Sequence, residues 1–471
     1  MVEGTGEGLK IKNEKLRIMN HYISKIFFIF NFSFLIALAS CSVSKQISKQ
    51  ANATLLNDSA ISKGHIGISI YEPATNTYWY NYNADKYFIP ASNTKLFTLY
   101  AGMKYLGDSL VGLRYQTNTS YNDTWVAFQV TGDPTFLHPD FKNQPVYNFF
   151  KKNSTHLSIV RDFNFKSQAL GKGWAWDDYN EDYMVERSGF PINGNLVTFS
   201  IQSDTIHAVP EIFNLKEYSS ISTWNANQPN WGMSFKIWKN RSGNYFQTIY
   251  SPDTNPLKES KIPFKTDDNN FIIKILENIL GSEMGRSRST GQYNRFQNIL
   301  HSQPSDSLFK PMMHRSDNFF AEQTLLMASN EHLGYMSDEK IIDTLLKLDL
   351  KDVPQKPRWV DGSGLSRYNL FTPQSFVYIL NKTKNEFGWD RLKNILPTGG
   401  TGTLSSYFKK DSSFIYAKTG TLSNNCALSG FLITKKGKLL IFSILANNYV
   451  GAATPVRKAT EKFLLEIREN Y

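Results

Sequence analysis

The stretch Pro90-Ala91-Ser92-Asn93-Thr94-Lys95-Leu96-Phe97 places a hydroxyl and an amine three residues apart. Apolar residues then recur at helical spacing as far as Met103, so the stretch is predicted to open a buried helix. Residues three apart in a helix lie on one face. An unprotonated lysine amine at that place can accept the proton of the serine hydroxyl, which makes the hydroxyl a nucleophile.

This spacing alone is not specific, because Ser-x-x-Lys occurs five times, at Ser42, Ser92, Ser307, Ser337 and Ser406. Only Ser92 follows a predicted β-hairpin, which is indicated by alternating isoleucines at 66–70 and alternating tyrosines at 78–82. Backbone N–H groups at the first turn of a helix are unpaired and electropositive, which suits an oxyanion. Ser92 is therefore the candidate nucleophile.

The first forty residues differ from the rest of the chain. Basic residues between Lys10 and Lys25 precede an apolar run at 26–39, which is short for a membrane span and typical of a secretory signal. The run ends in Leu38-Ala39-Ser40-Cys41, which resembles the lipobox of bacterial lipoproteins. We therefore predict a lipoprotein signal peptide at 1–41 and an exported, periplasmic protein held to a membrane by a lipid on Cys41. An ordinary signal peptide is the alternative.

Composition limits the other classes of function. The 471 residues are 41% hydrophobic and 14% aromatic, enough for two or three domains with real cores. The cysteines are Cys41 and Cys426, so lipidation of the first leaves no internal disulfide. The net charge of +11 is not concentrated in a basic run, and no nucleic-acid partner is expected of an exported protein. The eight histidines have no metal-ligand spacing, and neither metal nor cofactor is expected.

Residues 42–60 are predicted to be a polar tether.

The C-terminal part carries the clearest secondary structure. A strand is predicted at 414–421, a hairpin at 427–434 and 439–446, and a helix that begins at Thr454-Pro455. Together with the N-terminal hairpin, these strands predict one antiparallel sheet that is assembled from both ends of the chain and flanked by helices.

The middle of the chain has a different character. Short β-like runs at 125–130 and 196–201 stand among many turn residues, so residues 116–284 are predicted to form an inserted, β-rich region of one or two subdomains. The catalytic domain would then comprise residues 61–115 and 285–471, and the fold class is α+β.

Further helices are expected at 271–280, at 293–300 and after Asn318. The adjacent Asp177 and Asp178 could serve as an acid–base pair. A loop cap beside a packed tryptophan explains them better, because aspartates favour such turns.

Three short motifs stand in order along the chain, Ser92-x-x-Lys95, Ser316-Asp317-Asn318 and Lys418-Thr419-Gly420. This set is typical of penicillin-binding proteins and class A β-lactamases. Taken singly, each motif has a plain explanation: a helix cap for the first, a turn for the second and a solvated strand lysine for the third. Their joint occurrence on the expected elements favours the catalytic interpretation.

The distance between the first two motifs along the chain narrows the resemblance to one family. Ser92 and Ser316 are 224 residues apart, too far for a compact β-lactamase. The chain resembles the D-alanyl-D-alanine carboxypeptidases/endopeptidases of peptidase family S13, the low-molecular-mass class C penicillin-binding proteins, whose large insertion follows the nucleophile helix. The segments that carry this resemblance are Gly132-Asp133-Pro134-Thr135, Gly173-Trp174-Ala175-Trp176-Asp177-Asp178, Asp361-Gly362-Ser363-Gly364-Leu365-Ser366-Arg367 and Lys418-Thr419-Gly420-Thr421-Leu422.

The resemblance implies a serine β-lactamase/DD-peptidase-like domain and a two-step acyl transfer on peptidoglycan stem peptides, inhibited covalently by β-lactams. Ser92 would be the nucleophile and Lys95 the base, with a pKa lowered by burial and by Lys418 as a cationic neighbour. Ser316 would relay a proton to the leaving amine, and Asn318 would bind the substrate amide and Lys95.

For the substrate, the resemblance implies an oxyanion hole made by the backbone N–H groups of Ser92 and Thr421. Lys418 and the hydroxyls of Thr419 and Thr421 would bind the substrate carboxylate beside Gly420. Asp317 and Asp361 are expected to be structural. Carboxypeptidase and endopeptidase activity both stay open. The alternatives are a β-lactamase or esterase on the same scaffold and a non-catalytic peptidoglycan-binding lipoprotein.

Overall fold

The computed structural model describes residues 43–120, 123–153, 157–159, 164–202, 205–223, 235–241, 243–250, 259–266, 268–284, 296–410 and 412–471. The predicted signal peptide and its Cys41 lie outside these residues. Within the described ranges, no helix combines the length and the apolar character that a membrane span requires.

A five-stranded antiparallel sheet joins the two ends of the chain, as predicted. Its order is β13-β14-β15-β1-β2, with β1 at His65–Glu72, β2 at Thr77–Tyr82, β13 at Ile415–Leu422, β14 at Asn425–Ile433 and β15 at Leu439–Asn447. The N-terminal hairpin pairs with the C-terminal one in a register that sets His65 opposite Asn447. Strand β13, which carries the Lys-Thr-Gly motif, therefore lies at an edge of the sheet.

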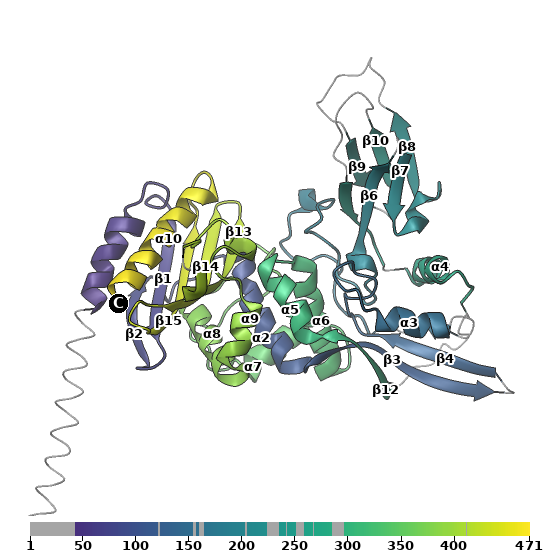
Figure 1. Cartoon of the computed structure of the whole chain (residues 1–471), viewed down its shortest axis with the longest axis horizontal. Helices are drawn as coiled ribbons and strands as arrows, with labels where there is room; N and C mark the ends of the chain where they lie inside the picture. Colours follow the sequence, from purple (N-terminus) through teal and green to yellow (C-terminus); the bar gives the residue numbers. More distant parts are fainter. Residues whose placement is uncertain are drawn as a thin grey trace, which may run out of the picture.

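One face of the sheet is covered by α10 (Ala453–Asn470) and by the N-terminal helical segment (Figure 1). Residues 43–51 are α-helical, and Asn52–Leu56 continue as a π-helical turn. Ile47, Ala51 and Leu55 are fully buried in the same apolar core as the buried side of α10. The predicted tether at 42–60 is therefore wrong. The polar composition concealed an apolar residue at every fourth position, which gives the helix one buried face.

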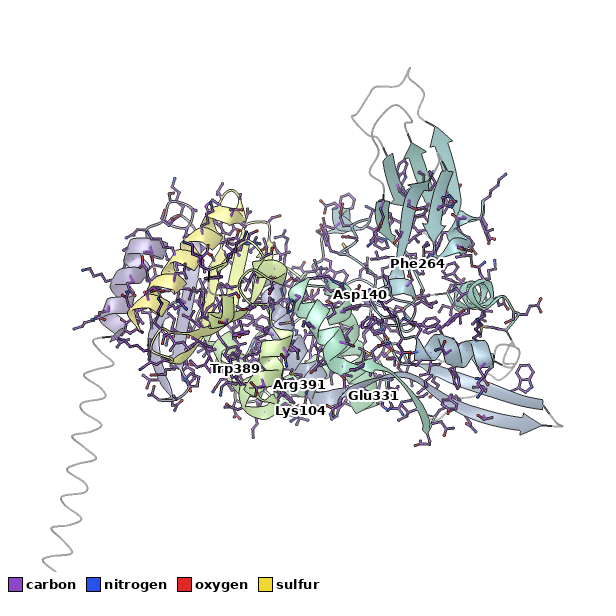
Figure 2. All side chains as sticks on the ribbon, in the orientation of Figure 1. Lys104, Asp140, Phe264, Glu331, Trp389 and Arg391 are labelled. Atoms are coloured by element: carbon purple, nitrogen blue, oxygen red, sulfur yellow. The ribbon has the colours of Figure 1, made fainter. Side chains whose placement is uncertain are left out.

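The other face of the sheet packs on the helices of the catalytic domain. These are α2 (Lys95–Tyr105), α5 (Ser305–His314), α6 (Asn318–Leu333), α7 (Asp338–Lys347), α8 (Pro373–Phe387) and α9 (Trp389–Ile395). Helix α8 lies against β1 and β15, and α2 lies between α6 and α8. On α9, Trp389 packs on Phe431 of β14 while Arg391 pairs with Asp306 of α5 at 2.7 Å (Figure 2). The nucleophile helix α2 is thus enclosed on all sides.

The insertion is connected to the catalytic domain through two paired strands. β3 (Ser109–Ser120) and β12 (Asn298–Pro304) are antiparallel neighbours, so the insertion begins before residue 116 and ends after residue 284. The predicted helix at 293–300 is wrong at its described end, where residues 298–300 belong to β12. Pairing with β3 satisfies the backbone of this segment and overrides its local helical pattern.

The rest of the insertion is β-rich, as predicted. It contains α3 (Pro145–Lys152), α4 (Asn269–Leu280), β4 (Asp123–Val130), β5 (Leu157–Ile159), β6 (Leu196–Gln202), β7 (Thr205–Val209), β8 (Ser219–Thr223), β9 (Phe235–Lys239), β10 (Phe246–Tyr250) and β11 (Glu259–Pro263). Its described strands form the sheets β12-β3-β4-β5, β11-β6-β7 and β8-β10-β9. Buried side chains, among them Phe213, Phe246 and Phe264, fill a core within it. Figure 2 labels Phe264.

Candidate active site

Ser92 lies on a 3₁₀ turn, Ala91–Thr94, that continues directly into α2. The turn is held to the sheet because Asn93 Nδ2 donates to Ser429 Oγ of β14 at 2.7 Å. Gly364 supports it from the other side. A Cβ at Gly364, whose φ is +83°, would stand 1.9 Å from the carbonyl oxygen of Ala91. Only glycine allows this approach, so the glycine-rich loop 361–367 fixes the position of the nucleophile.

Lys95 places its amine against Ser92, as the spacing predicted. Its Nζ lies 3.1 Å from Ser92 Oγ and donates to Asn318 Oδ1 at 2.6 Å and to the carbonyl oxygen of Ser363 at 2.7 Å. The side chain is fully buried. The three acceptors fix the amine in one place, within reach of the hydroxyl proton.

Burial lowers the pKa of Lys95 to about 8, although the carboxylates of Asp361, Glu322 and Asp317 act in the opposite direction. A pKa of this size supplies a neutral amine close to neutral pH, as a general base requires. Burial is the main cause of this shift. Lys95 and Lys418 also repel each other, and this repulsion is, after burial, a cause of the lowered pKa of Lys418.

The Ser316-Asp317-Asn318 motif forms the turn that opens α6. Ser316 is in the left-handed region with φ +61°, and Asp317 caps the helix by accepting a hydrogen bond from the backbone N–H of Phe320 at 2.9 Å. The structural role predicted for Asp317 is confirmed. The cap turns Asn318 toward Lys95, and its Nδ2 donates to the carbonyl oxygen of Tyr183 in the insertion.

Lys418 of the third motif lies beside Ser316 of the second. It is fully buried on β13, and its Nζ donates to Ser316 Oγ at 2.9 Å and to the carbonyl oxygen of Thr419 at 2.7 Å. Burial, together with the positive charges of Lys95 and Arg457, lowers its pKa well below the ordinary lysine value. Ser316 and Lys418 thus form a second hydroxyl–amine pair beside Ser92 and Lys95.

The strand that carries Lys418 passes unusually close to the nucleophile. A Cβ at Gly420 would lie 2.6 Å from the carbonyl oxygen of Pro90 and 3.0 Å from the backbone nitrogen of Ser92. Gly420 is therefore needed for this approach, which sets the next residue, Thr421, beside Ser92 on the edge strand. This close approach of the two segments is compatible with the predicted oxyanion hole, whose two N–H donors belong to them.

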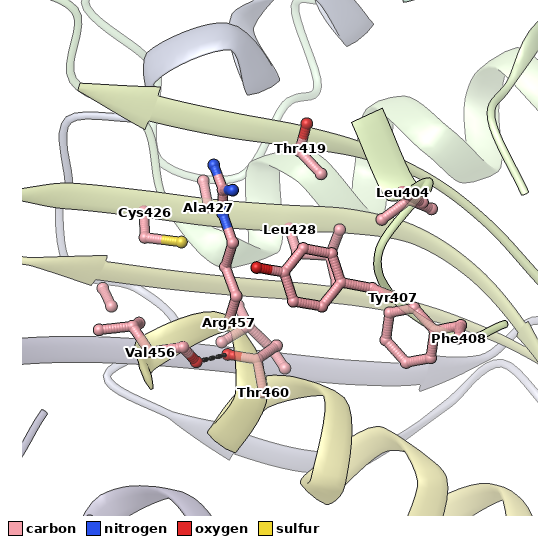
Figure 3. Close-up of a pocket in the computed structure, with 12 residues that line it drawn as sticks. Leu404, Tyr407, Phe408, Thr419, Cys426, Ala427, Leu428, Val456, Arg457 and Thr460 are labelled. Atoms are coloured by element: carbon pink, nitrogen blue, oxygen red, sulfur yellow. Dashed lines mark hydrogen bonds between the residues drawn. The ribbon is translucent and has the colours of Figure 1, made fainter. Parts of the chain in front are cut away.

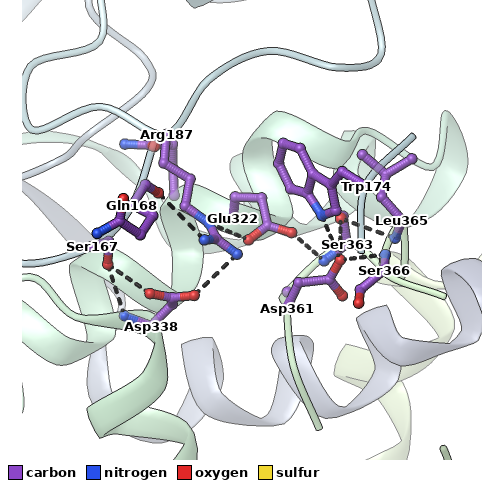
Figure 4. A network of polar contacts seen from close by, with 12 residues as sticks. Ser167, Gln168, Trp174, Arg187, Glu322, Asp338, Asp361, Ser363, Leu365 and Ser366 are labelled. Atoms are coloured by element: carbon purple, nitrogen blue, oxygen red, sulfur yellow. Dashed lines mark hydrogen bonds and ion pairs between the residues drawn. The ribbon is translucent and has the colours of Figure 1, made fainter. Parts of the chain in front are cut away.

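Behind the site lies a buried polar network that the sequence did not reveal (Figure 4). Glu322 of α6 accepts a hydrogen bond from the backbone N–H of Ser363 at 2.7 Å and pairs with Arg187 at 2.8 Å. Arg187 comes from the insertion and also pairs with Asp338 at 3.0 Å. This network holds the Ser363 carbonyl that contacts Lys95. The sequence contains one indication of this network. Glu322 is a charged residue in an otherwise apolar helix, and a buried charge needs a partner.

Asp361 has the structural role that was predicted. Its carboxylate accepts from the backbone N–H groups of Gly364 at 2.9 Å and Ser366 at 2.7 Å, and from Trp174 Nε1 at 2.9 Å. These bonds fold the loop that supports Ser92, and Trp174 is a third contact from the insertion, after Tyr183 and Arg187.

Asp177 and Asp178 do not form an acid–base pair at the site. They lie on a short 3₁₀ turn after the exposed Trp176, whose ring is covered by Arg241 at 4.6 Å. The tryptophan of this motif that packs toward the active site is Trp174, not Trp176.

Next to Ser316 and Asn318, a cavity of about 340 Å³ separates the catalytic domain from the insertion. It is lined by His138, Pro139, Asp140, Asp182, Tyr183, Val185, Asn193, Gly194, Leu196, Thr198, Lys261, Arg315, Ser316, Asp317, Asn318, Phe319 and Phe320. In the described part of the chain, no group of histidine, cysteine and carboxylate side chains could hold a metal ion.

The fold and the site together define a class of protein. A buried lysine beside a serine at a helix start, opposed by a second serine and a lysine on an edge strand, is the arrangement of the serine acyl-transfer enzymes that react with penicillin. The chain belongs to the D-Ala-D-Ala carboxypeptidase 3 (S13) family, whose model matches residues 48–469. It is therefore a hydrolase, a serine-type D-Ala-D-Ala carboxypeptidase by class.

Known proteins agree with this assignment. D-alanyl-D-alanine carboxypeptidase DacB of Haemophilus influenzae is 23% identical over 409 residues, 78% of this chain and 82% of that protein. Penicillin-sensitive carboxypeptidase A of Dictyostelium discoideum is 23% identical over 444 residues, 82% and 83% of the two chains. The crystal structure of penicillin binding protein 4 from Haemophilus influenzae has a TM-score of 0.71 at 20% identity, covering 90% of this chain and 99% of that one.

Proposed function

We propose that Ser92 attacks the carbonyl group before the terminal D-Ala, or before a D-amino cross-link, of peptidoglycan stem peptides. The observation that carries this is the distance of 3.1 Å between Ser92 Oγ and a buried Lys95 amine whose pKa is lowered to about 8. The enzyme would act as a D-Ala-D-Ala carboxypeptidase, a D,D-endopeptidase, or both.

The reaction has two steps. Neutral Lys95 accepts the Ser92 proton as Oγ bonds to the carbonyl carbon, and the oxyanion is bound by the backbone N–H groups of Ser92 and Thr421. Ser316, held by Lys418, passes a proton to the leaving amine as the C–N bond breaks and regains one from protonated Lys95, which becomes neutral again. Water then attacks the acyl-enzyme and gives a proton to Lys95, which passes it to Ser92 Oγ as the ester bond breaks.

Asn318 has two tasks in this scheme. Its Oδ1 accepts a hydrogen bond from Lys95, and its Nδ2 faces the insertion, where it can donate to the amide carbonyl of a bound peptide. One side chain thus couples the position of the base to the position of the substrate.

The sharpest test compares wild-type protein with Ser92→Ala, using a fluorescent penicillin and cross-linked muropeptides. Wild type is expected to take up the label at Ser92 and to release D-Ala, cut cross-links or do both, and mass spectrometry of the products tells these apart. Ser92→Ala should do neither. Label retained by Ser92→Ala would overturn the assignment, whereas rapid loss of the penicilloyl group from wild type would favour the β-lactamase alternative.

We further propose that the protein is exported to the periplasm and anchored by a lipid on Cys41. The basic and apolar residues before Leu38-Ala39-Ser40-Cys41 support this. Because residues 43–51 are already helical and packed on the catalytic domain, the lipid would hold that domain close to the membrane. Labelled fatty acid should enter wild type and not Cys41→Ser. Equal labelling of both proteins would exclude this anchor.

A further inference from the structure

Arg457 is a charged residue at the active site that none of the three motifs contains. It lies in the first turn of α10, and its side chain runs from that helix across β14 toward the Lys418 strand (Figure 3). There its Nη2 donates a hydrogen bond to Thr421 Oγ1, the hydroxyl that follows the Lys-Thr-Gly motif.

Tyr407 and Cys426 flank the Arg457 side chain in the same pocket (Figure 3). The Tyr407 ring lies 5.9 Å from the central guanidinium carbon. Neither neighbour is a carboxylate, and among the described residues Arg457 makes no ion pair with a carboxylate. A half-buried arginine without an anionic partner is unusual, because buried charges are normally paired.

The positive charges near Ser92 are balanced by carboxylates on one side only. Lys95 has three carboxylates near it, Asp361, Glu322 and Asp317. On the β13 side, the positive charge of Arg457 adds, after burial and Lys95, to the causes that lower the pKa of Lys418. A bound anion would relieve this repulsion.

The hydrogen bond also orients Thr421. Since the arginine donates to Thr421 Oγ1, the hydroxyl proton is directed to another acceptor. Thr421 is exposed, whereas the pocket behind it, between the sheet and α10, holds only about 20 Å³, room for about one water. An anion must therefore approach from the open edge of β13, where a peptide substrate would lie.

We propose that the Arg457 guanidinium, with the hydroxyls of Thr419 and Thr421, binds the carboxylate of the leaving D-amino acid. Arg457 then makes the enzyme selective for substrates that have a free carboxylate at this position. The inference rests on the proposed function, since it concerns the leaving group of the same reaction.

The test uses a diacylated tripeptide that ends in D-Ala-D-Ala, as the free acid and as the C-terminal amide. Wild type should prefer the acid in kcat/KM, and Arg457→Ala should lose about 10- to 100-fold on the acid and little on the amide. Arg457→Lys should recover part of the loss. Lys458→Ala removes an exposed charge from the adjacent position and serves as the matched control.

A second readout separates carboxylate binding from a structural role. The carboxylate has left once the acyl-enzyme forms, so Arg457→Ala should slow acylation by the free acid and leave hydrolysis of the acyl-enzyme unchanged. Equal losses on acid and amide, or an unchanged preference for the acid, would overturn the proposal while the function stands. If wild type cleaves neither peptide and takes up no penicillin, the proposed function itself fails.

Discussion

The surroundings of Ser92 and the core of the outer insertion differ in character. Around Ser92, the catalytic domain encloses polar groups, among them Lys95, Lys418, Glu322 and Asp361, which are all fully buried. The insertion has an apolar core of aliphatic and aromatic side chains, such as Phe199 packed on Phe246. A buried polar network requires one exact arrangement, whereas an apolar core tolerates exchange. Residues near the site are therefore expected to be far more sensitive to substitution than those in the distal sheets.

The catalytic domain and the insertion contact each other beside the candidate active site. Arg187, Trp174 and Tyr183 of the insertion contact Glu322, Asp361 and Asn318 of the catalytic domain. The insertion thus completes the site through these side chains and through Leu196, Thr198 and Lys261 of the sheet β11-β6-β7, which line the cavity beside Ser316. The sheet β8-β10-β9 lies farther from α2 (Figure 1). The predictions below test this division, from the largest expected effect on acylation to the smallest.

Lys95→Ala should produce the largest loss. Without the amine, no group takes the Ser92 proton, and the rate of acylation by penicillin should fall by about 10²–10⁴-fold. Stopped-flow or gel-based measurement of the acylation rate checks this, with circular dichroism to show that the fold is kept. A loss below about tenfold would mean that another base serves Ser92.

The acylation rate should also depend on pH through the same amine. Lys95 must be neutral, and its pKa is about 8. Below that pH the neutral fraction, and with it the rate, should fall about tenfold per pH unit, and above it the rate should level off. A profile of acylation rate against pH tests the sign. A flat rate on the acid side would contradict Lys95 as the base.

Arg187→Ala breaks the contact between the two regions. It leaves the buried Glu322 and Asp338 without their cation, which should lower the free energy of unfolding by about 3–5 kcal/mol. Ser363 would lose its fixed position, so acylation should slow as well. Denaturant unfolding measures the first effect, and Glu322→Gln, which keeps the shape of the side chain, measures the second if Arg187→Ala does not fold. Wild-type stability in Arg187→Ala would show that the network is not structural.

Phe246→Ala tests the opposite case, a large change in the core of the distal sheets. Removing a fully buried ring should destabilise the insertion by about 3–5 kcal/mol. Acylation should stay within about twofold of wild type, because the substitution shares no partner with the site. Hydrogen exchange should show faster opening of the outer strands. A strong loss of acylation would mean that the insertion acts as one rigid unit with the site.

Much of the catalytic domain could be predicted from the sequence. The strands of the central sheet, the helix after Asn318 and the C-terminal helix follow from local periodicity, and the structure confirms them. The segment at 43–56 and the strand β12 were predicted wrongly. Both are decided by distant partners, α10 for the first and β3 for the second, and such partners do not appear in a local pattern.

By itself, the sequence determined the chemistry of this protein. A serine and a lysine three residues apart, with two further motifs in order, indicate which groups would react, because their spacing along the chain sets their distance. Only the tertiary structure decided how those groups are tuned and what surrounds them. The contact of Lys95 with the Ser363 carbonyl, the ion pair of Glu322 with Arg187 and the reach of Arg457 to Thr421 join residues 36 to 268 positions apart. Burial, which lowers the pKa of Lys95, likewise exists only once the whole chain has enclosed it.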